Sequence, residues 1–205
     1  MNRAADLHGD GGLPLEFSDA DQGRHILGVW AFLASDIVLF CCLFAVYAVY
    51  RTQVASGPSP AQLFSYPPVI IETVLLLTSS FTCSLALYEM RRGRSHSLIA
   101  LILLTVLLGA GFVGMEVHDF ASYVALGDTW HRSAFLSAFF TLVGTHGAHV
   151  SFGILWALTL VVQLLQRGVT PVTARKVYTF ALYWHFLDLV WVFIFTFVYL
   201  TGKLG

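Results

Sequence analysis

The sequence has few charged residues: only 11% of its 205 residues are Asp, Glu, Lys or Arg, whereas 57% are hydrophobic. A chain of this length cannot bury so much apolar surface inside itself, so lipid must be its solvent. The 11 basic and 12 acidic residues give a formal net charge of −1. The chain therefore lacks a basic field that would attract nucleic acid, and nucleic-acid binding is excluded.

Two other signals are missing. The three cysteines, Cys41, Cys42 and Cys83, lie in apolar runs without the spacing of a metal or redox motif, so we expect them to pack as small hydrophobic residues. The polar N-terminus lacks the basic start and apolar centre of a cleavable signal peptide. We predict a flexible polar tail over residues 1–24 and one transmembrane domain over residues 25–205.

Five apolar stretches are each long enough to cross a bilayer, which takes about 20 residues. They cover residues 26–50, 68–90, 97–117, 134–166 and 177–201. All six prolines lie outside the interiors of these stretches, as expected for unbroken helices that satisfy their own backbone hydrogen bonds. The sequence therefore predicts an all-α integral membrane protein with five transmembrane helices.

The loops predict the orientation of the chain. With five spans, eight of the 11 basic residues lie on the side of the N-terminus and three on the other side. By the positive-inside rule, the N-terminus is cytoplasmic and the C-terminus periplasmic. A cluster of Arg91, Arg92 and Arg94 in one cytoplasmic loop also matches anionic lipid head groups. These arginines, with Trp184 and Trp191, are our candidate lipid-binding residues.

Ionisable residues inside the spans are costly, so each needs a partner or a function. One set lies near the midplane of the membrane and another near its outer face. The midplane set is Asp36, His146, His149, His185 and Asp188, and the outer set is Glu72, Glu116, His118 and Asp119. Helical spacing places Trp184, His185, Asp188 and Trp191 on one broad face, which we expect to turn inward or toward a partner.

Two interpretations of the histidines remain open at this point. His146, His149 and His185 have the chemistry of metal or haem ligands, but intramembrane histidines are more often neutral groups bonded to a neighbour such as Asp188. Asp36 is either a proton relay or a neutral carboxyl group bonded to another helix. Glu72 and Glu116 are expected to be structural, sharing a proton or bonding His118.

Several segments carry a family resemblance. The segment 184–191, WHFLDLVW, resembles the signature of subunit III of the haem-copper respiratory oxidases, and 144–150, GTHGAHV, and 32–40, FLASDIVLF, agree with it. The segments 109–120 and 132–140 look closest to the quinol-oxidising, cytochrome bo-type branch. The resemblance runs from about residue 24 to the C-terminus.

The resemblance implies a non-catalytic subunit of a bacterial inner-membrane enzyme. Haems and copper belong to its partner, catalytic subunit I, so this chain is expected to hold no catalytic or metal-binding residue. Subunits II and IV and phospholipids are further expected partners. It also implies two helices arranged against three around a lipid-filled cleft, close to the proton-uptake path of subunit I. Asp36 occupies the position of the family's buried carboxylate, which is more often Glu, so a relay role does not carry over.

Three other functions remain as alternatives. Short bacterial cytochrome c oxidases have a similar subunit III, so the choice between quinol and cytochrome c as electron donor rests on local motif likeness alone. A small ion or proton transporter would use Asp36, Asp188 and the histidines to line its path. A membrane cytochrome would use His146, His149 and His185 as haem ligands and would absorb visible light when isolated.

Overall fold

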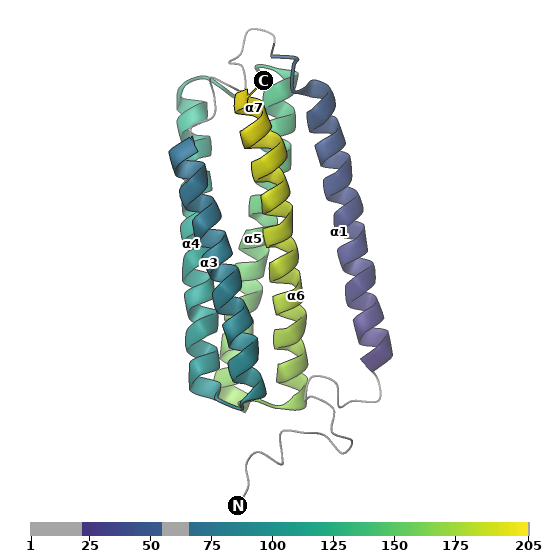
Figure 1. Cartoon of the computed structure of the whole chain (residues 1–205), viewed down its shortest axis with the longest axis vertical. Helices are drawn as coiled ribbons and strands as arrows, with labels where there is room; N and C mark the ends of the chain where they lie inside the picture. The colour runs from purple at the N-terminus through teal and green to yellow at the C-terminus, as the bar shows by residue number, and fades with distance from the viewer. Residues whose placement is uncertain (1–21, 55–65, 205) are drawn as a thin grey trace, which may run out of the picture.

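The computed structural model describes residues 22–54 and 66–204, which fold into long helices and short connections (Figure 1). The helices are α1 (Gln22–Tyr50), α3 (Tyr66–Arg91), α4 (Ser95–Ala125), α5 (Ala134–Arg167) and α6 (Pro171–Ile194), and α6 continues through the π-helix η3 (Phe195–Leu200) into α7 (Thr201–Leu204). Five segments are long and apolar enough to cross a membrane. The prediction of five transmembrane helices is therefore confirmed. Residues 1–21 of the predicted tail lie outside the described residues.

Local signals set the helix ends, and two ends differ from our prediction by more than one turn of helix. Helix α6 begins six residues before residue 177 because Thr170 and Thr173 form a capping box and Pro171 occupies the first turn. Helix α4 continues past residue 117 to Ala125, and the next residue with a positive φ is Gly127, at 84°. The polar residues between 118 and 125 thus extend the helix beyond the apolar run without interrupting it.

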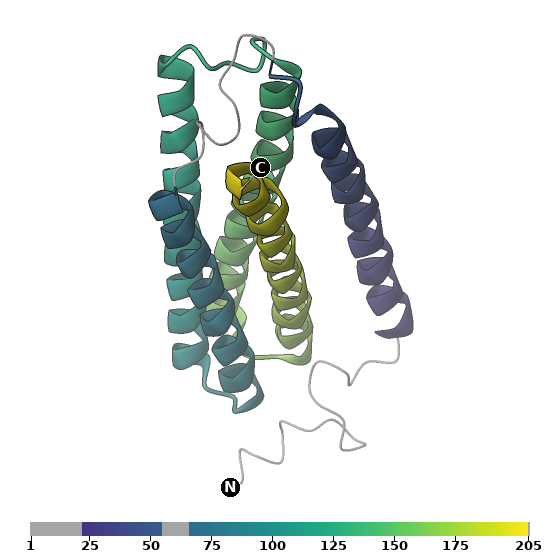
Figure 2. The ribbon, with the colours of Figure 1, turned by 45° about the horizontal axis from the view of Figure 1, so that its top comes forward.

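The arrangement of the helices corrects the predicted division of two against three. Helices α3, α4, α5 and α6 form a four-helix bundle, and α1 lies along one side of it, against α5 and to a smaller extent α6 (Figures 1 and 2). The second span, α3, packs most extensively against the third, α4, which the prediction placed in the other group. A tight turn with Gly93 at φ 68° joins α3 to α4, and Thr82 and Thr105 are hydrogen-bonded across the pair at 2.8 Å. The observed division is one helix against four.

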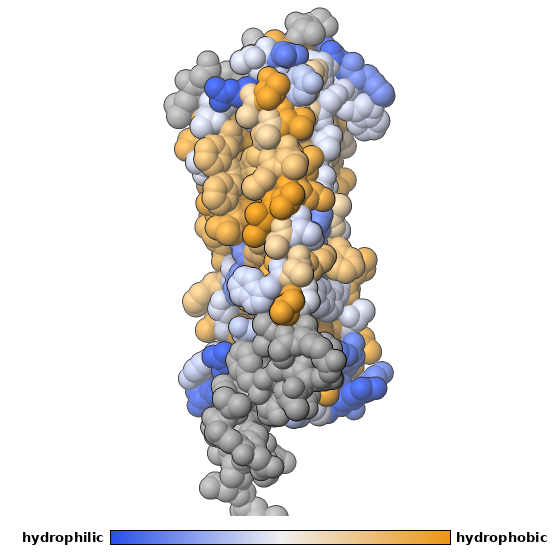
Figure 3. Space-filling model, turned by 90° about the vertical axis from the view of Figure 1, so that its right-hand side faces the viewer, coloured by the Kyte–Doolittle hydropathy of each residue, from blue (hydrophilic) through white to orange (hydrophobic). Residues whose placement is uncertain are grey.

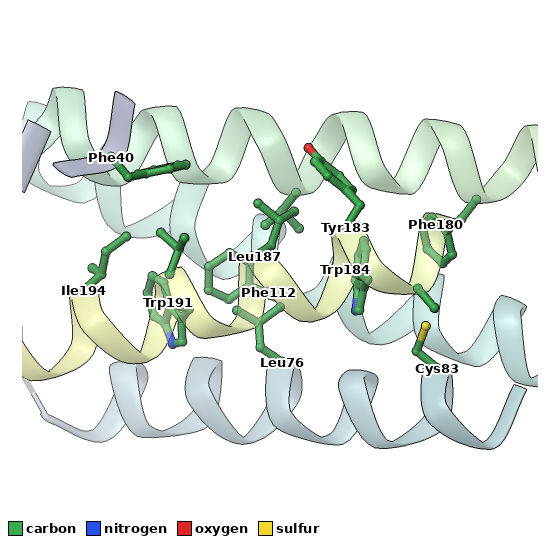
Figure 4. Close-up of a cluster of buried hydrophobic side chains, with 14 of the residues drawn as sticks. Phe40, Leu76, Cys83, Phe112, Phe180, Tyr183, Trp184, Leu187, Trp191 and Ile194 are labelled. Carbon is green, nitrogen blue, oxygen red and sulfur yellow. The ribbon is translucent and has the colours of Figure 1, made fainter. Parts of the chain in front are cut away.

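The core of the bundle is built around two tryptophans of α6. Trp184 and Trp191 are each 1% exposed, and in Figure 4 both indoles point from α6 toward α3. Their Nε1 atoms donate hydrogen bonds to Ser79 Oγ at 3.0 Å and Thr73 Oγ1 at 3.1 Å. The predicted face of α6 therefore turns inward. Because neither side chain reaches the surface of this chain, the predicted lipid contact does not hold for these two residues.

The outer surface fits a bilayer. Figure 3 shows a broad band of hydrophobic side chains between hydrophilic groups at the two ends of the molecule. Large apolar residues of every spanning helix are exposed, including Val38, Leu77, Leu107, Leu155 and Leu189. In water these residues would form a patch far larger than a monomeric protein tolerates, so lipid or partner helices must cover them.

Candidate functional site: polar clusters in the membrane core

The predicted ionisable residues are distributed over separate helix interfaces. One pair joins α1 to α5, a second cluster lies between α3 and α6, a third lies where α3, α4 and α5 meet, and one histidine lies alone in the core. In that order they are Asp36 with His149, His185 with Asp188, Glu72 with Glu116, and His146. The residues of the two predicted layers therefore lie at four separate places, each between different helices.

Asp36 and His149 connect α1 to the bundle. Asp36 is 6% exposed, and its Oδ1 lies 3.9 Å from His149 Nε2. The other ring nitrogen, Nδ1, lies 2.7 Å from the carbonyl oxygen of Thr145. A carbonyl can only accept, so Nδ1 carries the hydrogen, and in a neutral ring the Nε2 that faces Asp36 is an acceptor. The pair thus places a carboxyl group of α1 opposite an imidazole of α5.

His146 is enclosed by aromatic rings. The side chain is fully buried, stacks on Trp191 with a centroid distance of 5.3 Å, and meets the edges of Phe112 at 5.8 Å and Phe40 at 6.3 Å. Neither ring nitrogen has a hydrogen-bond partner among the described residues. His146 therefore packs as an aromatic group at the point where α1, α4, α5 and α6 meet.

His185 binds serine hydroxyl groups of α3. Its Nδ1 lies 2.7 Å from Ser80 Oγ and its Nε2 lies 3.3 Å from Ser84 Oγ, whereas Asp188 Oδ2 is 3.9 Å away. The predicted bond to Asp188 is therefore replaced by closer hydroxyl partners. These two serines were not among the predicted site residues, although their spacing of four residues in an apolar run places both on one helix face.

Glu72 on α3 and Glu116 on α4 form a buried carboxyl pair. They are 2% and 5% exposed. Gly147 on α5 makes room for Glu116, since a Cβ atom there would lie 2.6 Å from Glu116 Oε1. The predicted bond from Glu116 to His118 is not formed, because the His118 side chain is 80% exposed and lies 3.6 Å from Asp119 instead.

The three histidines do not converge on one point. His149 faces α1, His185 faces α3 and His146 is enclosed in the core. In the part of the chain that the structure describes, no three His, Cys, Asp or Glu side chains are grouped so that they could hold a metal ion. The three histidines therefore contact neighbouring helices separately, and among the described residues they do not form one metal-binding site.

Two hollows and a basic turn complete the candidate features. A hollow of about 400 Å³ lies between α1, α5 and α6, and one of about 630 Å³ lies between α1 and the α6–η3 segment, with Arg51 at its outer end. At the opposite end of the molecule, Arg91, Arg92 and Arg94 are exposed in the turn between α3 and α4. Arg92 donates a hydrogen bond to Tyr88 Oη at 2.8 Å, and Arg94 lies 3.6 Å from Glu89.

The fold and these interhelical pairs define a multi-pass, all-α membrane protein that buries several ionisable groups between its helices. Residues 17–203 match the family Cytochrome c oxidase subunit III, and the chain belongs to that family.

Similar proteins come from several bacteria. Quinol oxidase subunit 3 of Bacillus spizizenii is 49% identical over 97% of this chain and 97% of its own length. Cytochrome c oxidase subunit 3 of Bacillus sp. (strain PS3) is 50% identical over 90% of this chain and 89% of its own. Cytochrome bo(3) ubiquinol oxidase subunit 3 of Pseudomonas aeruginosa is 47% identical over 89% of this chain and 87% of its own.

Proposed function

We propose that this chain is subunit III of a bacterial terminal quinol oxidase, the enzyme that couples quinol oxidation to oxygen reduction and proton pumping. The observation that carries the proposal is the 49% identity to a quinol oxidase subunit 3 over 97% of both chains. A cytochrome c oxidase is the second candidate, because a subunit 3 of that enzyme is 50% identical over 90% of this chain.

In this proposal the chain supports catalysis and takes no part in the redox chemistry. Haems, copper and the quinol site lie in catalytic subunit I, and subunits II and IV complete the enzyme. The described residues favour this role, because their histidines are distributed over separate interfaces and form no ligand set. The same distribution argues against a transporter, whose polar groups would line one continuous path.

The proposed orientation in the cytoplasmic membrane places the N-terminus inside and the C-terminus in the periplasm. The exposed arginines 91, 92 and 94 then lie at the cytoplasmic surface, where they attract anionic phospholipid head groups. The two hollows beside α1 have the size and apolar lining that suit lipid acyl chains. Bound phospholipid is therefore part of the proposal, and lipid extraction of the purified complex tests it.

Electron-donor specificity tests the proposed enzyme directly. When the tagged chain is purified in mild detergent, we expect a large haem-bearing subunit to accompany it and the preparation to reduce oxygen with quinol as donor. Oxygen consumption with a short-chain quinol and with reduced cytochrome c is the measurement. Turnover with cytochrome c alone would assign the chain to the second candidate, and purification without a haem protein would contradict both.

We further propose a structural role for the buried pairs, with Asp36 holding α1 against α5. Replacing Asp36 with Asn keeps a polar group of the same size beside His149, so assembly and proton pumping are expected to stay close to those of the parent. The matched control is Ser35→Ala, since the exposed Ser35 hydroxyl bonds the Phe32 carbonyl of its own helix. Proton pumping by the oxidase in vesicles is the readout. A D36N enzyme that assembles and consumes oxygen but pumps fewer protons would show a relay role instead.

A further inference from the structure

A group of polar side chains reaches the outer surface of the bundle inside the membrane. Helices α3 and α6 run side by side (Figure 1), and the seam between them contains Ser80, Ser84, His185 and Asp188. Ser84 is exposed and the His185 side chain is 36% exposed. His185 lies near the centre of its span, Pro171–Leu200, and Ser84 lies inside its span, Pro67–Arg91, about two turns from the end. We call these four residues the α3–α6 polar seam.

Other exposed hydroxyl groups of the spans form their hydrogen bonds within their own helix. Thr78 donates to the Val74 carbonyl and Thr159 to the Trp156 carbonyl, both at 2.7 Å, so each satisfies itself on its own helix. The seam differs because its serine hydroxyl groups bind an imidazole on another helix, and that imidazole is itself at the surface. A neutral imidazole has one donor and one acceptor, so the two serines use both ring nitrogens of His185, and the remaining hydrogen-bonding capacity at this surface belongs to the exposed Ser84 hydroxyl. Hydrocarbon offers no hydrogen bonds, so a polar partner at this hydroxyl is favourable.

We propose that the α3–α6 polar seam is the contact surface for a transmembrane helix of another oxidase subunit, which presents a hydrogen-bonding side chain inside the membrane. A phospholipid does not fit this role, because its polar head lies at the edge of the hydrocarbon core, whereas Ser84 lies about 10 Å along α3 from the end of its span. Apolar residues flank the seam on both helices, with Phe81 63% and Leu189 55% exposed. A polar centre within an apolar surface is the pattern by which membrane helices associate.

The choice of another subunit as the occupant rests on the proposed function, since a subunit III works inside a complex of several membrane chains. The occupant is expected to carry a serine, threonine, asparagine, glutamine or protonated carboxyl group opposite Ser84. These side chains can donate to or accept from the Ser84 hydroxyl without bringing a charge into the membrane.

Photo-cross-linking in the intact complex tests the inference. A photoreactive amino acid is placed at Phe81 or Leu189 beside the seam, and at Leu107 or Leu155 as controls of similar exposure, 68% and 63%. Cross-links to a different subunit are expected from the first pair. If haem-bearing subunits are present but that pair cross-links only to lipid, or to a second copy of this chain, the inference is overturned and the proposed function is not. Absence of those subunits would overturn the proposed function and the inference together.

A hydroxyl deletion gives an independent readout. Ser84→Ala removes one exposed hydroxyl from the seam without opening the core, and Thr78→Val is the matched control on the same helix. The retention of partner subunits during detergent washing is expected to fall about threefold for S84A, the equivalent of one interhelical hydrogen bond of ~0.6 kcal/mol. Equal retention for both variants would show that the Ser84 hydroxyl contributes nothing to assembly.

Discussion

Replacing Gly153 or Gly109 with alanine is expected to destabilise the bundle by about 1–2 kcal/mol. A Cβ atom at Gly109 would lie 2.8 Å from Trp184 Cη2, and one at Gly153 would lie 2.9 Å from Trp184 Cζ3. The indole is rigid, 1% exposed and hydrogen-bonded to Ser79, so it has little room to move away from either methyl group. Crowding of this kind costs about 1–3 kcal/mol, which exceeds the gain of about 0.5–1 kcal/mol from the better helix propensity of alanine.

The thermal unfolding midpoint of the purified complex in detergent measures this effect. Gly114→Ala is the matched control, because Gly114 lies in the same helix as Gly109 and a Cβ atom there meets nothing within 4 Å. G114A is expected to be neutral or slightly stabilising, whereas G109A and G153A lower the midpoint. Equal midpoints for all three variants would contradict the packing of Trp184 between α4 and α5.

Deleting the whole chain is expected to have a different and larger consequence. The haem spectrum of the catalytic subunit should stay nearly normal, because the His, Cys, Asp and Glu side chains of the described residues form no group of three that could hold a metal ion. Activity should start near its usual value and then decline during turnover, since the support of the proton-uptake path is lost. The decline is a property of the enzyme at work, so storage without substrate should not reproduce it.

Much of the fold could be predicted because lipid imposes a strict rule on the sequence. Each span must be a long apolar helix, and ionisable residues inside a span must be covered. Those two requirements predicted the five helices and the inward face that carries Trp184 and Trp191. They do not determine which helices are neighbours, because every span offers some polar or small residues to any partner. The grouping of α3 with α4 therefore differed from the division implied by family resemblance.

The hydrogen-bond partners of individual polar groups could not be predicted either, because they too depend on which helices are neighbours. His185 binds serines more than 100 residues away, at distances that depend on the rotation of both helices. A nearby carboxylate on its own helix, Asp188, was the partner that spacing favoured, yet the α3 hydroxyl groups lie closer to the ring. The need for a glycine at 147 could not be predicted from the sequence, because it arises from the carboxyl group of Glu116, which lies against it in the fold.

The central claim, that this chain sustains an oxidase without holding its redox centres, is tested most directly by following that deletion through turnover. Oxidase prepared with and without the chain is compared in two ways: by its reduced-minus-oxidised spectrum and by its oxygen consumption over many turnovers. The account predicts matching spectra and matching initial rates, followed by progressive inactivation only where the chain is absent, with stability restored when the chain is supplied again. An enzyme without the chain that pumps protons and survives long turnover like the intact complex would contradict it.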